Sequence, residues 1–128
     1  MEVIDKASNL EISYDQTQNI LFCRWIGVQN TEGIKSSGQQ ILTHVRGKSI
    51  CRVLNDNREV RGPWQEAASW AAADWFPEMK AAGLRHFAWV LSADIFAEIS
   101  ARRAMQHIEG VRPFQNYEEA YTWLLSQQ

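Results

Sequence analysis

Apolar residues in this chain recur at two different spacings, and the change from one spacing to the other constrains the fold more than any other feature. Residues 10–14 alternate apolar and polar side chains, which is typical of a strand with one solvated face. A polar cluster at residues 15–19 follows, and residues 20–26 form a second strand-like run. Because the link is short and polar, we expect these two strands to pair as an antiparallel hairpin.

Helical and strand-like segments alternate after the hairpin. A helix is expected at residues 31–48, because apolar residues recur there at helical spacing. Asp94 and Asn116 are suitable N-caps for two later helices, and Pro77 predicts a kink or break near residues 75–76. The remaining strands are expected at residues 50–54, 87–91 and 111–114, and the remaining helices at residues 63–83, 94–107 and from 116 onward.

The predicted order of elements is β-β-α-β-α-β-α-β-α. This order indicates an α/β fold, with a mixed five-stranded sheet, an N-terminal hairpin and four helices on right-handed crossovers. The 128 residues include 45% hydrophobic residues and no linker rich in Pro, Gly or Ser. Residues 1–128 are therefore expected to form a single domain with one substantial core.

Charge, hydrophobic runs and the N-terminal residues indicate which classes of partner and which cellular location to expect. A formal net charge of −2 without a basic stripe argues against nucleic-acid binding. No run approaches about 18 consecutive apolar residues, so no transmembrane segment is expected. The N-terminus lacks the basic start and apolar run of a secretion signal, so we expect a cytoplasmic protein.

Motifs for catalysis, metals or cofactors are absent from the sequence. Cys23 and Cys51 fall in predicted strands and are expected to be buried free thiols, with a disulfide as the alternative. Their separation does not match metal-ligand spacing. No nucleophile motif and no glycine-rich phosphate loop is present. We therefore predict no enzymatic activity, no metal site and no cofactor.

Four short stretches carry a family resemblance. They are residues 54–58 (LNDNR), 75–77 (WFP), 82–83 (AG) and 114–124 (FQNYEEAYTWL). Together with the order of elements, they resemble the small SpoIIAA-like proteins of bacteria, which have the STAS fold of anti-sigma-factor antagonists. The resemblance covers essentially the whole chain and implies a STAS fold.

The resemblance also shows where this chain departs from the antagonists. In them, a serine beside an aspartate at the start of the second helix is phosphorylated, and the added charge switches partner binding. Residues 58–66 match that position and contain no Ser or Thr; the nearest hydroxyl belongs to Ser69. No phosphorylation site is therefore predicted, and the resemblance implies a regulatory module without that switch.

The junction between the third strand and the second long helix is one candidate site. In sheets of this kind ligands tend to bind where strand ends meet helix starts. Free amides and two arginines suit a small anion such as phosphate or a carboxylate. The alternative is a turn whose side chains bond their own backbone, with both arginines in water. The candidate residues are Asp56, Asn57, Arg58 and Arg61.

Two further candidate sites are apolar. Trp64, Trp70 and Trp75 either line a hollow that holds a lipid or similar small molecule, or pack solidly against the sheet. Arg24 and Arg52 interrupt an apolar sheet face, which is typical of a docking site for a partner. The alternative is that the first helix or the N-terminal segment covers this face.

We therefore predict a non-catalytic regulatory or protein-interaction module of STAS type. It would dock another protein or a second copy of itself as a homodimer. The alternative function is a small-molecule or lipid-binding carrier that uses an apolar pocket near the tryptophan-rich helix.

Overall fold

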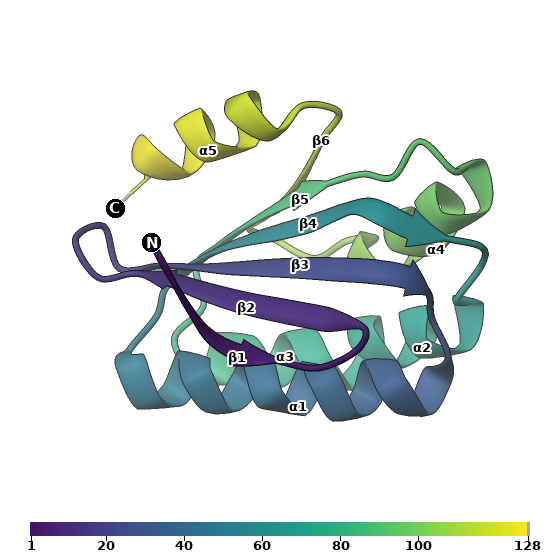
Figure 1. Ribbon diagram of the computed structural model, residues 1–128, viewed down its shortest axis with the longest axis horizontal. Helices are drawn as coiled ribbons and strands as arrows, with labels where there is room; N and C mark the ends of the chain where they lie inside the picture. The colour runs from purple at the N-terminus through teal and green to yellow at the C-terminus, as the bar shows by residue number, and fades with distance from the viewer. Residues whose placement is uncertain (128) are drawn as a thin grey trace.

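The computed structural model describes residues 1–127, which form a six-stranded sheet flanked by helices (Figure 1). The strands are β1 (Glu2–Lys6), β2 (Leu10–Asp15), β3 (Ile20–Val28), β4 (Arg52–Arg61), β5 (His86–Val90) and β6 (Val111–Phe114). The helices are α1 (Thr31–Lys48), α2 (Gln65–Trp70), α3 (Phe76–Ala81), α4 (Ile95–Met105) and α5 (Tyr117–Leu125), and a π-helical segment, η1 (Ala71–Trp75), joins α2 to α3.

The strands lie side by side in the order in which they occur along the chain. β1, β2 and β3 pair antiparallel, whereas β3, β4, β5 and β6 pair parallel. The predicted α/β class, hairpin and mixed sheet are confirmed, but the expected count of five strands omits β1. This edge strand escapes detection because a register shift between Val3 and Asp5 interrupts its period-two alternation.

β4 is much longer than the predicted third strand. Residues 55–61 were expected to form a turn, yet they continue the strand and pair with β3 as far as Val28 opposite Arg61. Arg24 pairs with Asp56, but Ile26 pairs with Glu59, so β4 contains one extra residue at this point. The turn prediction is wrong because these residues pair with β3, where Asn55 also bonds Trp25 and Glu59 pairs with Arg24.

The predicted helices are present, with local corrections. The bounds of α1 agree with the prediction, and the Asp94 and Asn116 side chains cap α4 and α5 as expected. The second long helix begins at Gln65 rather than at Pro63. The break near Pro77 takes the form of η1, in which the Phe76 amide donates to the Ala71 carbonyl five residues earlier.

Helices cover both faces of the sheet and create two apolar cores. α1, α2, η1, α3 and α4 contribute to the larger core on one face, and α5 lies across the opposite face of β4 and β5 (Figure 1). The second core consists of Ile20, Phe22, Leu54, Ala88 and Val90 packed against Ala120 and Leu124. The expectation that the first helix or the N-terminal segment covers this face is therefore wrong, because α5 covers it.

Arg52 anchors α5 instead of forming an open partner site. Its Nη1 donates to the carbonyls of Leu124 at 3.1 Å and Gln127 at 3.3 Å, at the C-terminal end of the helix. Its Nη2 donates to the carbonyl of Gln18 in the β2–β3 turn. A positive charge at a helix C-terminus is also favoured by the helix dipole. Arg52 thus joins the last helix to the sheet and to the hairpin turn.

Both cysteines are free thiols. Cys23 is fully buried in β3, and its burial raises the pKa of the thiol. Cys51 lies just before β4 rather than inside a strand, and it is half-buried. Within residues 1–127, no helix is long and apolar enough to cross a membrane.

Replacing Leu124 by alanine tests whether α5 is an integral part of the second core. Leu124 is fully buried, so Leu124→Ala is expected to lower the free energy of unfolding by about 2–5 kcal/mol. Leu125→Ala is the matched control, because the neighbouring Leu125 is 40% exposed and should cost much less. Urea unfolding monitored by circular dichroism gives both values. Equal costs for the two variants would contradict the proposed packing of α5.

Candidate functional site: a tryptophan-lined pocket

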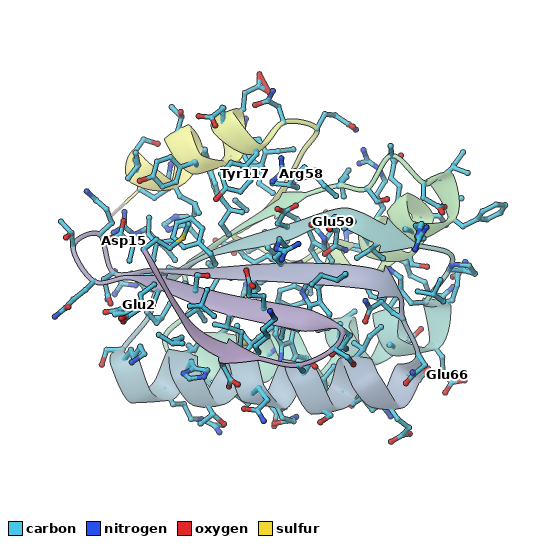
Figure 2. All side chains as sticks on the ribbon, viewed as in Figure 1. Glu2, Asp15, Arg58, Glu59, Glu66 and Tyr117 are labelled. Carbon is cyan, nitrogen blue, oxygen red and sulfur yellow. The ribbon has the colours of Figure 1, made fainter. Side chains whose placement is uncertain are left out.

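The candidate residues of the β4 junction are divided between the two faces of the sheet. The Asp56 carboxylate accepts from the backbone amide and Nε of Arg58, each at 3.0 Å, and from its Nη2 at 2.8 Å. The Arg58 guanidinium also lies 4.7 Å from the ring centroid of Tyr117 on α5 (Figure 2). These hydrogen bonds to Asp56 raise the pKa of Arg58. Asp56 and Arg58 thus form a closed pair on the α5 side.

Arg61 lies apart from that pair, at the exposed end of β4. It is close to Asp94, whose pKa is lowered first by the hydrogen bond from the Gly62 amide and further by the charge of Arg61. Asn57 is buried on the opposite face of the sheet from α5, together with residues of α1, α2 and η1. The four junction residues are therefore not brought together into a single anion site.

Arg24 is held by two acidic residues on the open part of the sheet. Its Nη1 pairs with Glu59, and its Nη2 lies 3.5 Å from Oε1 of Glu11 (Figure 2 labels Glu59). The hydrogen bond to Glu59 is the main cause of the raised pKa of Arg24. This part of the sheet is charged and internally paired, so it differs from the apolar docking surface that was expected around Arg24 and Arg52.

A pocket lies between the sheet and the helices α1, α2 and η1, and five of the six tryptophans line it. Trp64, Trp70 and Trp75, the three rings expected near a hollow, are all in its wall. We refer to this site as the tryptophan pocket. Its lining residues are Trp25, Gln29, Ile34, Gly38, Asn55, Asn57, Val60, Trp64, Trp70, Ala71, Trp75 and Trp89.

The enclosed space of the pocket is small. The centre of a water-sized molecule can occupy about 40 Å³ of it, whereas one water needs only about 10–15 Å³ by the same measure. The whole empty space is about 430 Å³, which includes the part open to solvent.

Close approach of α1 to two of the rings shapes the pocket wall. The Trp75 Nε1 donates to the Gly38 carbonyl at 2.8 Å, and the rings of Trp70 and Trp75 lie 6.4 Å apart. A Cβ atom at position 38 would lie 3.0 Å from Cη2 of Trp70 and 3.1 Å from Nε1 of Trp75. Glycine at this position therefore lets both rings pack directly on the backbone of α1.

A chain of side-chain hydrogen bonds crosses the sheet at the base of the pocket. Trp25 Nε1 donates to Asn55 Oδ1 at 2.8 Å, and Asn55 Nδ2 donates to Asn57 Oδ1 at 3.2 Å. An indole nitrogen can only donate, so Asn55 must present its oxygen to Trp25 and its amino group to Asn57. The direction of the chain is thereby fixed, and the chain ends at the Asn57 amino group in the pocket wall.

The electrostatic character of the pocket follows from its lining. None of the twelve lining residues carries an ionisable side chain. Trp64 and Trp89 stack at a centroid distance of 6.0 Å, and the buried Nε1 of each has no acceptor among residues 1–127. The accessible pocket wall is therefore almost entirely apolar and uncharged, and the two indole nitrogens are buried behind it.

Sequence reasoning identified the tryptophans of α2 and η1 but missed those of the sheet. Trp25 and Trp89 belong to β3 and β5 and line the pocket beside Asn55 of β4. The period-two alternation of side chains along the strands could have placed them. Trp25 lies on the same strand face as Cys23, and Asn55 pairs with Trp89 of the neighbouring strand. The described residues contain no group of three or more His, Cys, Asp or Glu placed to hold a metal ion.

Comparison with known proteins supports the fold. No protein-family model matches the chain, and no curated protein matches it. Among solved structures, it is similar to an uncharacterised protein of the DUF3478 family with a SpoIIAA-like fold from Shewanella loihica PV-4. The two share 16% sequence identity and a TM-score of 0.59, over 94% of this chain and 98% of the other. The chain therefore has an α/β fold of the SpoIIAA-like, or STAS, type.

Substituting Gly38 tests the close packing of the pocket wall. Alanine has the higher helix propensity, by about 1 kcal/mol, but its methyl group would collide with both rings, which costs about 1–3 kcal/mol. Gly38→Ala is therefore expected to lower the free energy of unfolding and to change tryptophan fluorescence. Gly47→Ala is the control, because open space surrounds Gly47 in the same helix and the substitution should stabilise the protein. Equal stabilisation by both substitutions would contradict this account.

Proposed function

We propose that this protein is a non-catalytic binding module that holds a small organic molecule in the tryptophan pocket. The observation that carries the proposal is the convergence on one cavity of five tryptophans, from β3, β5, α2, η1 and the residue just before α2. Large aromatic rings normally fill a core, and a cavity surrounded by them forgoes packing energy. A concave apolar site with a few polar groups is the usual form of a small-molecule site.

The dimensions of the pocket favour a compact ligand over a long lipid. The inner space of about 40 Å³ accepts a group of a few non-hydrogen atoms. The wider empty space at the mouth includes open solvent, so it adds little enclosed room. A long acyl chain would have to extend from the mouth into solvent. The proposal is therefore a small-molecule carrier or sensor rather than a fatty-acid carrier.

The chemistry of the lining supports binding rather than catalysis. General acid–base catalysis needs a side chain that gains or loses a proton near the working pH. The lining consists of indoles, amides, aliphatic side chains and one glycine, and none of these titrates in that range. The accessible surface of the lining is almost entirely apolar, so apolar and aromatic contacts would hold a ligand there.

A screen of small molecules tests this proposal without assuming their class. The full chain is titrated with uncharged, anionic and cationic fragments, and binding is followed by ligand-detected NMR. Ala71→Leu adds a larger side chain to the pocket wall and should abolish binding of the hits. Ala81→Leu is the control at an exposed position of α3 and should retain binding. The proposal fails if no fragment binds, or if Ala71→Leu leaves the binding of every hit unchanged.

A second candidate function, docking of another protein or a second copy, has a specific observation in its favour. Ile95, Phe96 and Ile99 on α4 are 62%, 60% and 47% exposed. Exposed aliphatic and aromatic residues grouped in this way are typical of interaction surfaces. This surface replaces the sheet face around Arg24 and Arg52 as the place where such a partner would dock.

Light scattering after size-exclusion chromatography tests the homodimer. If α4 mediates self-association, the apparent mass should rise with protein concentration, and Phe96→Asp should return it to 14.7 kDa. Glu66→Asp, on the surface of α2, is a control that should leave the mass unchanged. A mass of one chain at all concentrations would exclude self-association through α4.

A further inference from the structure

We infer that two copies of this chain associate through the exposed face of α4, with the two helices antiparallel about a two-fold axis at Ile99. This inference rests on the second candidate function, docking through α4, and it specifies the partner and its orientation. Three features of α4 carry it: the size of its outward side chains, its fixed position, and the distribution of its charges.

The large apolar side chains at the start of α4 point away from the core. Ile95, Phe96 and Ile99 are exposed. The buried face of the helix consists only of small residues, namely Ala97, Ser100, Ala101 and Ala104. A surface helix normally buries its large apolar residues, so this pattern is inverted. Large apolar side chains grouped on the surface are typical of an interaction site.

α4 is held in a fixed position beside the carboxyl end of β4 (Figure 1). The Asp94 carboxylate accepts from the Phe96 amide at 2.9 Å and from the Gly62 amide at 3.0 Å, which ties the start of the helix to the end of β4. The Ser100 hydroxyl accepts from the Trp64 amide at 2.9 Å, which ties its middle to the start of α2. A surface on such a fixed element loses little conformational entropy on binding.

The charges of α4 are separated along its length. Asp94 and Glu98 lie at its start, whereas Arg102 and Arg103 lie near its end. Because the two signs are equal in number, the helix has no basic excess to attract an anionic lipid surface. A second copy in the reverse orientation presents opposite charges to each half of the helix, and such complementarity fixes the register of an interface.

Helical spacing determines which charged residues meet. With 3.6 residues per turn, Ile99 and Arg102 both face outward, and a two-fold axis at Ile99 places Arg102 between Asp94 and Glu98 of the second copy. The Arg102 Nε donates to Glu98 of its own helix at 2.8 Å, so the two Nη atoms remain to donate across the interface. Parallel helices would instead bring Arg102 against Arg102, which is unfavourable.

The other flank of the helix pairs apolar and basic residues. The same rotation brings Phe96 against Arg103 of the second copy, and a guanidinium over an aromatic ring is a favourable contact. Arg103 is exposed, and its Nη1 makes one long hydrogen bond, at 3.4 Å, to Gln65 of α2. Ile99 meets Ile99 of the second copy on the axis. The surface is therefore complementary to itself, as a two-fold interface requires.

Cysteine cross-linking tests the antiparallel arrangement. Ile99→Cys places a thiol on the two-fold axis, so mild oxidation with copper phenanthroline should give a dimer on non-reducing gels. Gln106→Cys is the control on the same helix, because it would lie about 10 Å along the helix from the axis. Its two thiols would be about 20 Å apart, too far for a disulfide. The unsubstituted chain gives the background from Cys23 and Cys51.

Charge reversal tests the contact between the two copies. Arg102→Glu would face Asp94 and Glu98 of the second copy, and it should raise the dissociation constant of the dimer at least about tenfold, since each dimer loses the contact twice. Sedimentation equilibrium measures this constant. Arg112→Glu is the control, because it changes the net charge equally at an exposed position of β6 and should leave the constant unchanged.

The outcomes separate the arrangement from docking through α4. A dimer that Phe96→Asp dissociates, but that Ile99→Cys does not cross-link or Gln106→Cys cross-links equally, would overturn the antiparallel arrangement alone. A dimer that Phe96→Asp leaves intact would overturn docking through α4. A monomer at all concentrations would overturn the second copy as the partner, and binding of that monomer to phosphatidylglycerol vesicles would assign α4 to a lipid surface. None of these results bears on the binding of small molecules in the tryptophan pocket.

Discussion

Burial of β4 on both faces is the constraint from which the layered structure follows. Val53 belongs to the core beneath the helices α1 to α4, and Leu54 belongs to the core beneath α5. A central parallel strand needs a cover on each side, because neither face can be left to water. The helices on the two faces are arranged differently. On one face several helical segments meet and leave the tryptophan pocket between them and the sheet. On the other face lies one short helix, α5, which Arg52 holds in place.

The same strand carries three consecutive buried polar residues, Asn55, Asp56 and Asn57, and hydrogen bonds offset the cost of their burial. Asn55 bonds to Trp25, which is 30 positions earlier in the chain, and to Asn57. On the other face of the sheet from Asn55, the Asp56 carboxylate pairs with the Arg58 guanidinium. Only the Asn55–Asn57 and Asp56–Arg58 contacts are local, and the bond to Trp25 is not visible in the sequence, so residues 55–61 resemble a turn although they form a strand.

Much of the fold was predictable because it depends on local physics. Helical spacing fixed α1, the Asp94 and Asn116 side chains marked two helix starts, and Pro77 marked the break that η1 provides. The edge strand β1, the length of β4 and the side taken by α5 depend on pairing register and on the path of the whole chain. The site divides in the same way. Trp64, Trp70 and Trp75 are near neighbours in the sequence, whereas Trp25, Asn55 and Trp89 converge only when three strands are aligned.

The order of strands in the sheet has a consequence for how the protein is made. Because each strand pairs with the one before it, every new strand can join an existing edge as the chain leaves the ribosome. The exception is the face that α5 covers, since this helix follows all six strands in the chain. Ile20, Phe22 and Leu54 therefore stay uncovered until α5 has been made. Until α5 packs on this face, its apolar side chains make the nascent chain prone to association.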